Sequence, residues 1–157
     1  MISDSQLLFS DGQAIVDTAI SDNVYNRYPA GNIQDADLNA TVDWGTGAPL
    51  YMLFYTGPVD FASGGAGTLV ITLESDSTSN LATPPTVHWT SVTYAVADLT
   101  AGTQFWAVIP PATGLQKWIG FRYTNGAGDF TAGTLSSMIL IGQSTKGPQY
   151  ASGLNHQ

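Results

Sequence analysis

Short apolar or alternating runs, separated by clusters of glycine, proline, asparagine and aspartate, recur along most of this chain. The clearest alternation lies at residues 68–74, where Leu69, Ile71 and Leu73 point to one side and the residues between them point to the other. Residues 50–56 (LYMLFYT) are apolar at almost every position, which predicts a central strand with both faces covered. No segment keeps a convincing helical period over about ten residues. The pattern therefore predicts an all-β protein.

The stretch from residue 115 to residue 141 predicts two antiparallel strands joined by a loop, a hairpin in the C-terminal half of the core. Its first half alternates, and its second half ends in a continuous apolar run. Between them, Asn125 and Gly126 tolerate the positive φ that a chain reversal needs. Phe130 and Thr131 are expected to fold back and pin this loop.

Four more segments have strand character, at residues 14–20, 24–28, 86–96 and 104–109. Together the segments make about eight strands, with turn residues between them. This number of short strands in one domain predicts a two-sheet antiparallel β-sandwich of jelly-roll type.

The chain is expected to form one β-sandwich domain over residues 1–142, followed by a polar C-terminal tail at 143–157. Residues 1–13 contain a short apolar run between polar flanks, formed by Leu7, Leu8 and Phe9. Two readings of this segment stay open, an N-terminal arm and an ordinary first strand. Residues 30–48 read as a long loop, which is uncommon in a compact domain unless it has a role.

Composition narrows the classes of function. The net charge is −8, with twelve acidic residues against four lysines and arginines, so nucleic-acid binding is not expected. There is no cysteine, which excludes disulfides and thiolate sites. The N-terminus lacks the basic start and apolar core of a signal peptide, and no apolar run is long enough to span a bilayer. We expect synthesis in a cytoplasm and no membrane partner.

The residues that could carry chemistry are few, and we expect no catalytic site, no metal site and no cofactor. His88 lies beside Trp89 and is interpreted as a partly buried strand residue, while His156 is next to the terminus. Asp35 and Asp37, with help from Asp43, could bind a cation, although the spacing is not that of an EF-hand and a solvated acidic loop is favoured. No serine sits in a nucleophile elbow.

Three colinear blocks resemble the jelly-roll capsid cement, or decoration, proteins of tailed bacteriophages. The first is ISDSQLLFSDGQAI near the start, with LLFSDGQA its most telling part. The second is GTGAPLYMLFYTGPVDFASGGAGTLVITLESD. The third runs from Leu99 to Leu140 and includes LTAGTQFWAVIPP, KWIGFRYT and DFTAGTLSSMIL. The sequence departs from the family pattern in the loop between Tyr28 and Gly45 and in the tail past Gly142.

This resemblance implies a structural protein on the outer surface of the virion, which binds the major capsid protein and bridges its subunits. Such proteins act without catalysis, by strand pairing and charge complementarity. Bridging at lattice symmetry axes also implies a homo-oligomer, either a dimer or a trimer. The candidate partner contacts are Leu7, Leu8 and Phe9 in the N-terminal segment, Trp44 in the long loop and Tyr150 in the tail.

The alternative function is a carbohydrate-binding β-sandwich module, in which aromatic side chains would stack on sugars. The candidate platforms are Trp44, Tyr51, Trp89, Trp106 and Trp118. Aromatic residues in strands are more often part of a core, because each buries a large apolar area. We therefore expect Trp106 and Trp118 to be core residues, and Trp44 alone to be open.

Overall fold

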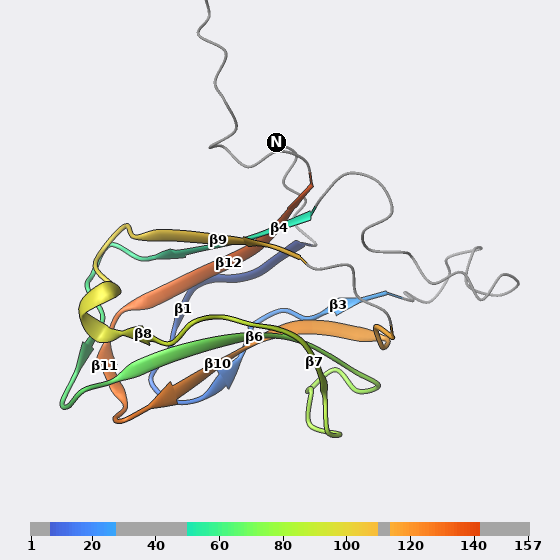
Figure 1. The fold of residues 1–157 in the computed structure, drawn as a ribbon, viewed down its shortest axis with the longest axis horizontal. Coiled ribbons are helices and arrows are strands. Elements are labelled where there is room, and N and C mark those ends of the chain that lie inside the picture. Colours follow the sequence, from blue (N-terminus) through green and yellow to red (C-terminus); the bar gives the residue numbers. More distant parts are fainter. Residues whose placement is uncertain (1–6, 28–49, 110–113, 142–157) are drawn as a thin grey trace, which may run out of the picture.

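A computed structural model describes residues 7–27, 50–109 and 114–141 of the chain, and two stacked antiparallel sheets make up most of it (Figure 1). The first sheet has the strand order β1-β12-β4-β9. Its strands are β1 (Leu8–Ala14), β12 (Thr134–Ile141), β4 (Leu50–Thr56) and β9 (Gln104–Val108).

The second sheet is built around the long pair β10 (Trp118–Gly126) and β6 (Thr68–Asp76), which stay in register over all nine residues of each strand. Its edges are made of short strands: β2 (Ala19–Ile20) and β3 (Tyr25–Asn26) pair with β10, and β7 (Thr86–Thr90) and β8 (Tyr94–Ala95) pair with β6.

Two small elements complete the described fold. Strands β5 (Ala62–Ser63) and β11 (Phe130–Ala132) pair with each other at one end of the sandwich. A 3-10 turn, η2 (Val96–Asp98), leads from β8 toward β9. Across the described ranges, the structure contains no helix long and apolar enough to cross a membrane.

The jelly-roll prediction is confirmed, with twelve described strands in place of about eight. The difference arises because β2 and β3 share one side of β10, while β7 and β8 share one side of β6. Merging each of these pairs, and setting the β5–β11 pair aside, leaves two four-stranded sheets. Successive strands alternate between the two sheets, except that β6 is followed by β7 in the same sheet, and this is the connectivity of a jelly roll.

The predicted hairpin at residues 115–141 is wrong, because its two strands lie in opposite sheets. Strand β10 pairs with β2, β3 and β6, whereas β12 pairs with β1 and β4. The connection crosses from one sheet to the other. Phe130 does pin it, as expected: this side chain is 1% exposed, and its strand β11 pairs with β5.

The core lies between the sheets and is rich in phenylalanine. Phe54 of β4 contacts Phe121 of β10 edge to face, with ring centroids 5.0 Å apart, and Phe9 of β1 contacts the same ring at 4.9 Å. Edge-to-face packing of this kind adds to the stabilisation that burial provides. These contacts join β1, β4 and β10, and so tie the two sheets together.

A cluster of three hydroxyl groups is buried between the two sheets. The Tyr123 hydroxyl lies 2.7 Å from Ser10 Oγ and 2.6 Å from Ser137 Oγ, so it links β10 to β1 and β12. Burial raises the pKa of Tyr123 to about 12. The phenol therefore stays neutral, and its hydrogen bonds satisfy the hydroxyls that the core encloses.

Strand β4 is central in its sheet, as predicted, but only one face is fully covered. Met52 and Phe54 are completely buried toward the core, whereas Tyr51, Leu53 and Tyr55 on the other face are only half-buried. The expectation of a strand sealed on both faces is thus not met. The outward face of this sheet therefore stays partly exposed.

Candidate functional site

An apolar row crosses the outer face of the first sheet from edge to edge. Leu8 pairs with Met138, Met138 pairs with Leu53, and Leu53 pairs with Trp106. Residues paired across strands lie on the same face of a sheet. The row therefore joins one residue from each of β1, β12, β4 and β9.

Two further rows flank it on the same face. Leu140, Tyr51 and Val108 form one row, and Ser136, Tyr55 and Gln104 form the other. None of the residues in these three rows is charged, and Asp11 is the only charged residue in the four strands of the sheet. We call this surface the apolar face.

The apolar face is most open over β9. Trp106 is 44% exposed and Val108 is 47% exposed, while Ser136 and Leu140 are buried. Trp106 also contacts Tyr51 edge to face, with ring centroids 5.9 Å apart. The exposed area is thus an aromatic and aliphatic surface over β4 and β9.

The expectation that Trp106 belongs to the core is wrong. In β9, Phe105 and Ala107 pack against the core, and the side chains of a strand alternate between its faces. Trp106 must then point outward. Trp89 and Trp118 are half-buried, and Trp89 stacks on Phe54 in the core region.

Part of the outer face of the second sheet is covered by the chain itself. Leu81, in the connection between β6 and β7, is fully buried yet lies outside the main core cluster. Its Cδ1 would lie 3.0 Å from a Cβ added at Gly120 of β10, and Val24 Cγ1 would lie 2.8 Å from it. Glycine at position 120 therefore makes room for Leu81 and Val24 on this face.

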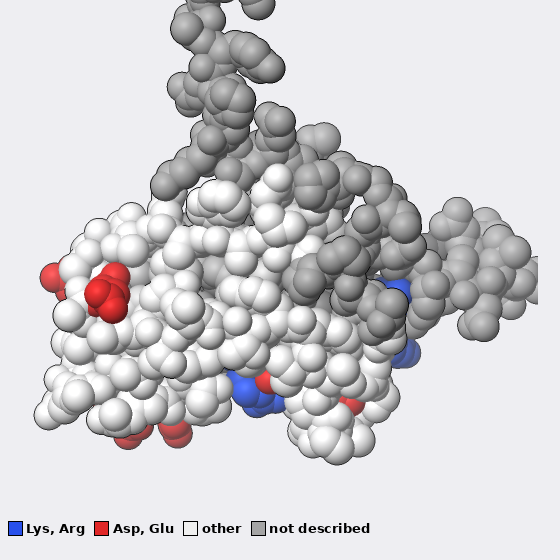
Figure 2. Space-filling view, in the orientation of Figure 1, with Lys and Arg blue, Asp and Glu red and all other residues white. Residues whose placement is uncertain are grey.

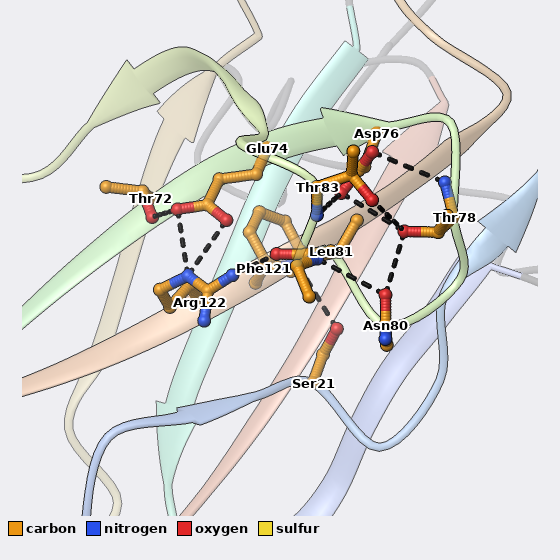
Figure 3. A network of polar contacts seen from close by, with 11 residues as sticks. Ser21, Thr72, Glu74, Asp76, Thr78, Asn80, Leu81, Thr83, Phe121 and Arg122 are labelled. Atoms are coloured by element: carbon orange, nitrogen blue, oxygen red, sulfur yellow. Dashed lines mark hydrogen bonds and ion pairs between the residues drawn. The ribbon is translucent and has the colours of Figure 1, made fainter.

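An ion pair holds this connection in place (Figure 3). Arg122 Nε lies 2.9 Å from Glu74 Oε2, and Arg122 Nη2 donates to the Leu81 carbonyl at 2.6 Å. Thr72 donates from its hydroxyl to the other Glu74 oxygen at 2.8 Å. The Glu74 side chain is only 5% exposed, so its charge is compensated where it is buried.

Asp76 organises the rest of the same connection. It is fully buried and accepts hydrogen bonds from the amides of Thr78 and Thr83 and from the hydroxyls of Ser77 and Thr78. Burial raises the pKa of Asp76, but these hydrogen bonds favour the charged form and outweigh it, so the pKa lies below its usual value.

His88 is a half-buried residue of β7, as predicted. Its Nε2 lies 2.7 Å from Ser75 Oγ, which also accepts a hydrogen bond from the Gln116 amide at 3.0 Å. Ser75 is completely buried, so this serine and histidine join β6 to β7 and offer no accessible nucleophile. Burial, and then the positive charge of Arg27, lower the pKa of His88.

The predicted contact residues of the N-terminal segment differ in how far the structure exposes them. Leu7 and Leu8 are half-buried, and Leu8 begins the central row of the apolar face. Phe9 is 1% exposed in the core, where its side chain cannot reach a partner. Residues 8–13 belong to β1, so they are a first strand and no arm.

Several predicted features lie outside the described residues. These are Trp44 and the rest of the loop at 30–48, the acidic residues at 35, 37 and 43, Tyr150 and the tail at 143–157. Within the ranges that the structure describes, no group of three or more histidine, cysteine, aspartate or glutamate residues could hold a metal ion.

The sequence analysis did not predict that one surface is shared by Leu53, Trp106, Val108 and Met138. A signal was present in β9, where alternation assigns Gln104, Trp106 and Val108 to one face and Phe105 and Ala107 to the other. Alternation alone does not show which of these two faces points toward the core.

Charge is distributed unevenly over the molecule. In the view of Figure 2, lysine and arginine gather at the lower and right-hand parts of the described surface, and acidic groups lie at its left and lower margins. The described surface along β9 is otherwise free of charge in this view. The residues that form the three rows of the apolar face carry no charge, so this face is less costly to desolvate than a charged surface.

Comparison with known protein families places the chain in a family. The model of a protein family described as Bbp16 matches residues 9–139, which is most of the chain and includes both sheets. Bbp16 is a phage-related family name. No curated protein matches the sequence.

Proposed function

Because the chain belongs to the Bbp16 family, a phage-related family, we propose that it is a structural decoration protein of a phage capsid. It binds the outer surface of the head and bridges neighbouring subunits of the major capsid protein. The observation that carries this proposal is the apolar face, an uncharged surface on a protein of net charge −8. Exposed apolar surfaces of this kind mark sites of interaction with other proteins.

The size of the apolar face fits a repeated, weak contact. At a spacing of ~4.8 Å between strands and a rise of ~3.4 Å per residue, its exposed part over β4 and β9 covers on the order of 200 Å². A stable two-protein interface buries about 800 Å² on each partner. A single contact of this size is therefore weak, and many copies on a lattice bind through multivalency.

The proposal includes the protein's setting and its partners. The chain is made in the host cytoplasm and resides on the virion, where its partners are the major capsid protein and further copies of itself in a dimer or a trimer. Copies around a lattice symmetry axis make such an oligomer the expected arrangement. Binding needs no enzyme activity, cofactor, metal ion, nucleic acid or membrane.

Cosedimentation with undecorated shells of the same virus tests the proposal, followed by electron microscopy of the pelleted shells. We expect saturable binding and added density at regular positions on the lattice. Scattered density, or none, would refute the proposal.

A pair of variants locates the contact. Trp106→Gln on the apolar face is expected to weaken shell binding at least about tenfold, the effect of ~1.4 kcal/mol. The matched control is Val92→Gln, which changes a side chain that is 69% exposed and lies between β7 and β8. Equal binding by the two variants would remove the apolar face from the proposal.

One observation favours a second candidate function, carbohydrate binding. The exposed Trp106 and its neighbour Tyr51 form an aromatic surface on which a sugar ring could stack. Tryptophan fluorescence during titration with an oligosaccharide panel tests this function. A saturable change that is lost in Trp106→Gln would support it, and a flat response across the panel would exclude it for those sugars.

A further inference from the structure

We propose that Met138 is an oxidation site through which a peroxide weakens binding at the apolar face. Oxidation of its thioether to a sulfoxide places a strongly polar oxygen in the middle of an apolar surface. The effect on binding rests on the proposed function, because it concerns the contact with the major capsid protein. The reactivity of Met138, compared with that of Met52, rests on the fold alone.

Met138 has a central position on the apolar face. It lies in β12, one of the two inner strands of the first sheet, and pairs with Leu8 of β1 on one side and Leu53 of β4 on the other. Leu53 pairs in turn with Trp106 of β9. A partner that extends across this row from β9 to β1 therefore covers Met138.

The fold leaves Met138 accessible and buries Met52. Met138 is half-buried on the outer face of the sheet, while its chain neighbours Ser137 and Ile139 are buried toward the core. Met52 faces the core from β4 and is 0% exposed. Met1, the third methionine, lies outside the described residues. A small oxidant in water therefore reaches Met138 in the folded protein, but reaches Met52 only after local unfolding.

No thiol competes with Met138 for the oxidant. The chain has no cysteine, whose thiolate is the sulfur group that enters oxidation most readily. Among the residues that the structure describes, sulfur occurs only in Met52 and Met138. The described fold thus offers a peroxide one accessible methionine, and this residue lies on the proposed binding surface.

The reaction needs only a peroxide, such as hydrogen peroxide, as the oxidant. A lone pair of Met138 Sδ attacks one peroxide oxygen, the O–O bond breaks, and a sulfur–oxygen bond forms. The second oxygen takes up the proton of the first and leaves as water. The sulfur loses two electrons and the peroxide gains them, so the products are one sulfoxide and one water molecule.

Oxidation is expected to change the surface more than the fold. The neighbours of Met138 in the row, Leu8 and Leu53, have no side-chain group that donates a hydrogen bond. A partner that covers the sulfoxide must remove water from its oxygen, and this costs free energy unless the partner supplies a donor. Strand β12 contacts the core through Leu135 and Ile139 on the opposite face, so the core contacts remain.

Two substitutions separate oxidation from packing. A methionine can serve packing alone, because its flexible side chain fills irregular gaps. Met138→Leu keeps a similar volume and an apolar surface, but it has no sulfur to oxidise. Met138→Gln imitates the polarity of the sulfoxide without any oxidant.

Peptide mass spectrometry of the full chain during treatment with dilute hydrogen peroxide tests the site. In the folded protein, we expect Met138 to gain one oxygen atom at least about tenfold faster than Met52, since Met52 must first become exposed. In concentrated urea the two rates should become similar, because unfolding removes the difference in solvent access. Similar rates in the folded protein would overturn the assignment of the site.

Cosedimentation with undecorated shells of the same virus tests the effect on binding. The oxidised wild-type protein should bind about tenfold more weakly than the untreated protein, and Met138→Gln should also lose affinity. Met138→Leu should bind like the wild-type protein, and the same peroxide treatment should leave its affinity unchanged. Near-ultraviolet circular dichroism establishes that each sample is folded.

Reversal distinguishes the sulfoxide from other damage. Methionine sulfoxide reductases for both sulfoxide epimers should restore the affinity of the oxidised wild-type protein. If oxidation of Met138 leaves the affinity unchanged, or if peroxide weakens Met138→Leu equally, the inference is overturned while the proposed function stands. If the untreated wild-type protein does not bind shells, the proposed function fails together with the effect on binding, and the oxidation rates still decide the site.

Discussion

The two sheets of this protein treat their outer faces in opposite ways. The second sheet is covered by the connection between β6 and β7, which places Leu81 over Gly120 and attaches to Arg122. The outer face of the first sheet leaves Trp106 and Val108 almost half exposed. We call the covered part of the second sheet the sealed face, and the exposed part of the first sheet over β4 and β9 the open face.

The chemistry of the two faces follows from this difference. The sealed face contains a carboxylate that is 5% exposed, and an arginine and a threonine hydroxyl compensate it. A buried charge needs such fixed partners. The open face carries no charge in its three rows, so a partner can cover it without desolvating an ion.

Leu81→Ala should produce the largest loss of stability. Leu81 is fully buried, and truncating a buried leucine lowers the free energy of unfolding by about 2–5 kcal/mol. Urea denaturation followed by tryptophan fluorescence measures the change. A loss below ~1 kcal/mol would mean that the covering connection contributes little, and that the two faces are more alike than the structure indicates.

Arg122→Met should cost about 2–3 kcal/mol, because it leaves the buried Glu74 carboxylate and the Leu81 carbonyl without their donor. The double variant Arg122→Met/Glu74→Gln removes the uncompensated charge and should recover part of the loss. A double-mutant cycle in urea gives the coupling between the two side chains. If the stability losses of the two single variants simply add, the ion pair between Arg122 and Glu74 does not help to hold the connection between β6 and β7.

The pH dependence of stability should be sensitive to His88 in the second sheet. Its pKa is lowered in the folded protein, mainly by burial, so below its unfolded value of 6.5 the unfolded chain binds more protons than the folded chain. Stability should therefore decrease as the pH falls below about 6.5. In His88→Asn this part of the pH dependence should disappear. Identical pH profiles of stability for the wild-type protein and His88→Asn would mean that His88 does not cause this pH dependence.

The smallest effect on stability is expected on the open face. Trp106→Gln should lower the free energy of unfolding by about 0.5–1.5 kcal/mol, because the side chain is 44% exposed and loses its edge-to-face contact with Tyr51. Parallel urea titrations with Leu81→Ala would compare the two faces directly. A loss of several kcal/mol would show that Trp106 supports the fold, and would weaken its assignment to a binding surface.

Strand β9 in the candidate site shows what the alternation of side chains can predict and what it cannot. Alternation in 104–109 divides its residues correctly into two sets, but hydrophobicity alone does not reveal which set faces the core, since Trp106 is as apolar as Phe105. Burial of Phe105 and Ala107 decides the matter, and burial depends on what lies across the sandwich. Phe9 is the opposite case. Its place in a short apolar run predicted a residue that contacts a partner, but its ring packs against Phe121 in the core.

The fold class and the position of most strands could be predicted from the amino-acid sequence, because strand formation depends on local alternation and on turn residues that lie close together in the chain. Residues 50–56, for example, coincide with β4. The pairing of the strands could not be predicted in this way: β10 and β12 are near neighbours in sequence but lie in opposite sheets. Pairing and the choice of outer face depend on contacts between distant segments. Local periodicity is the same whichever sheet a strand joins.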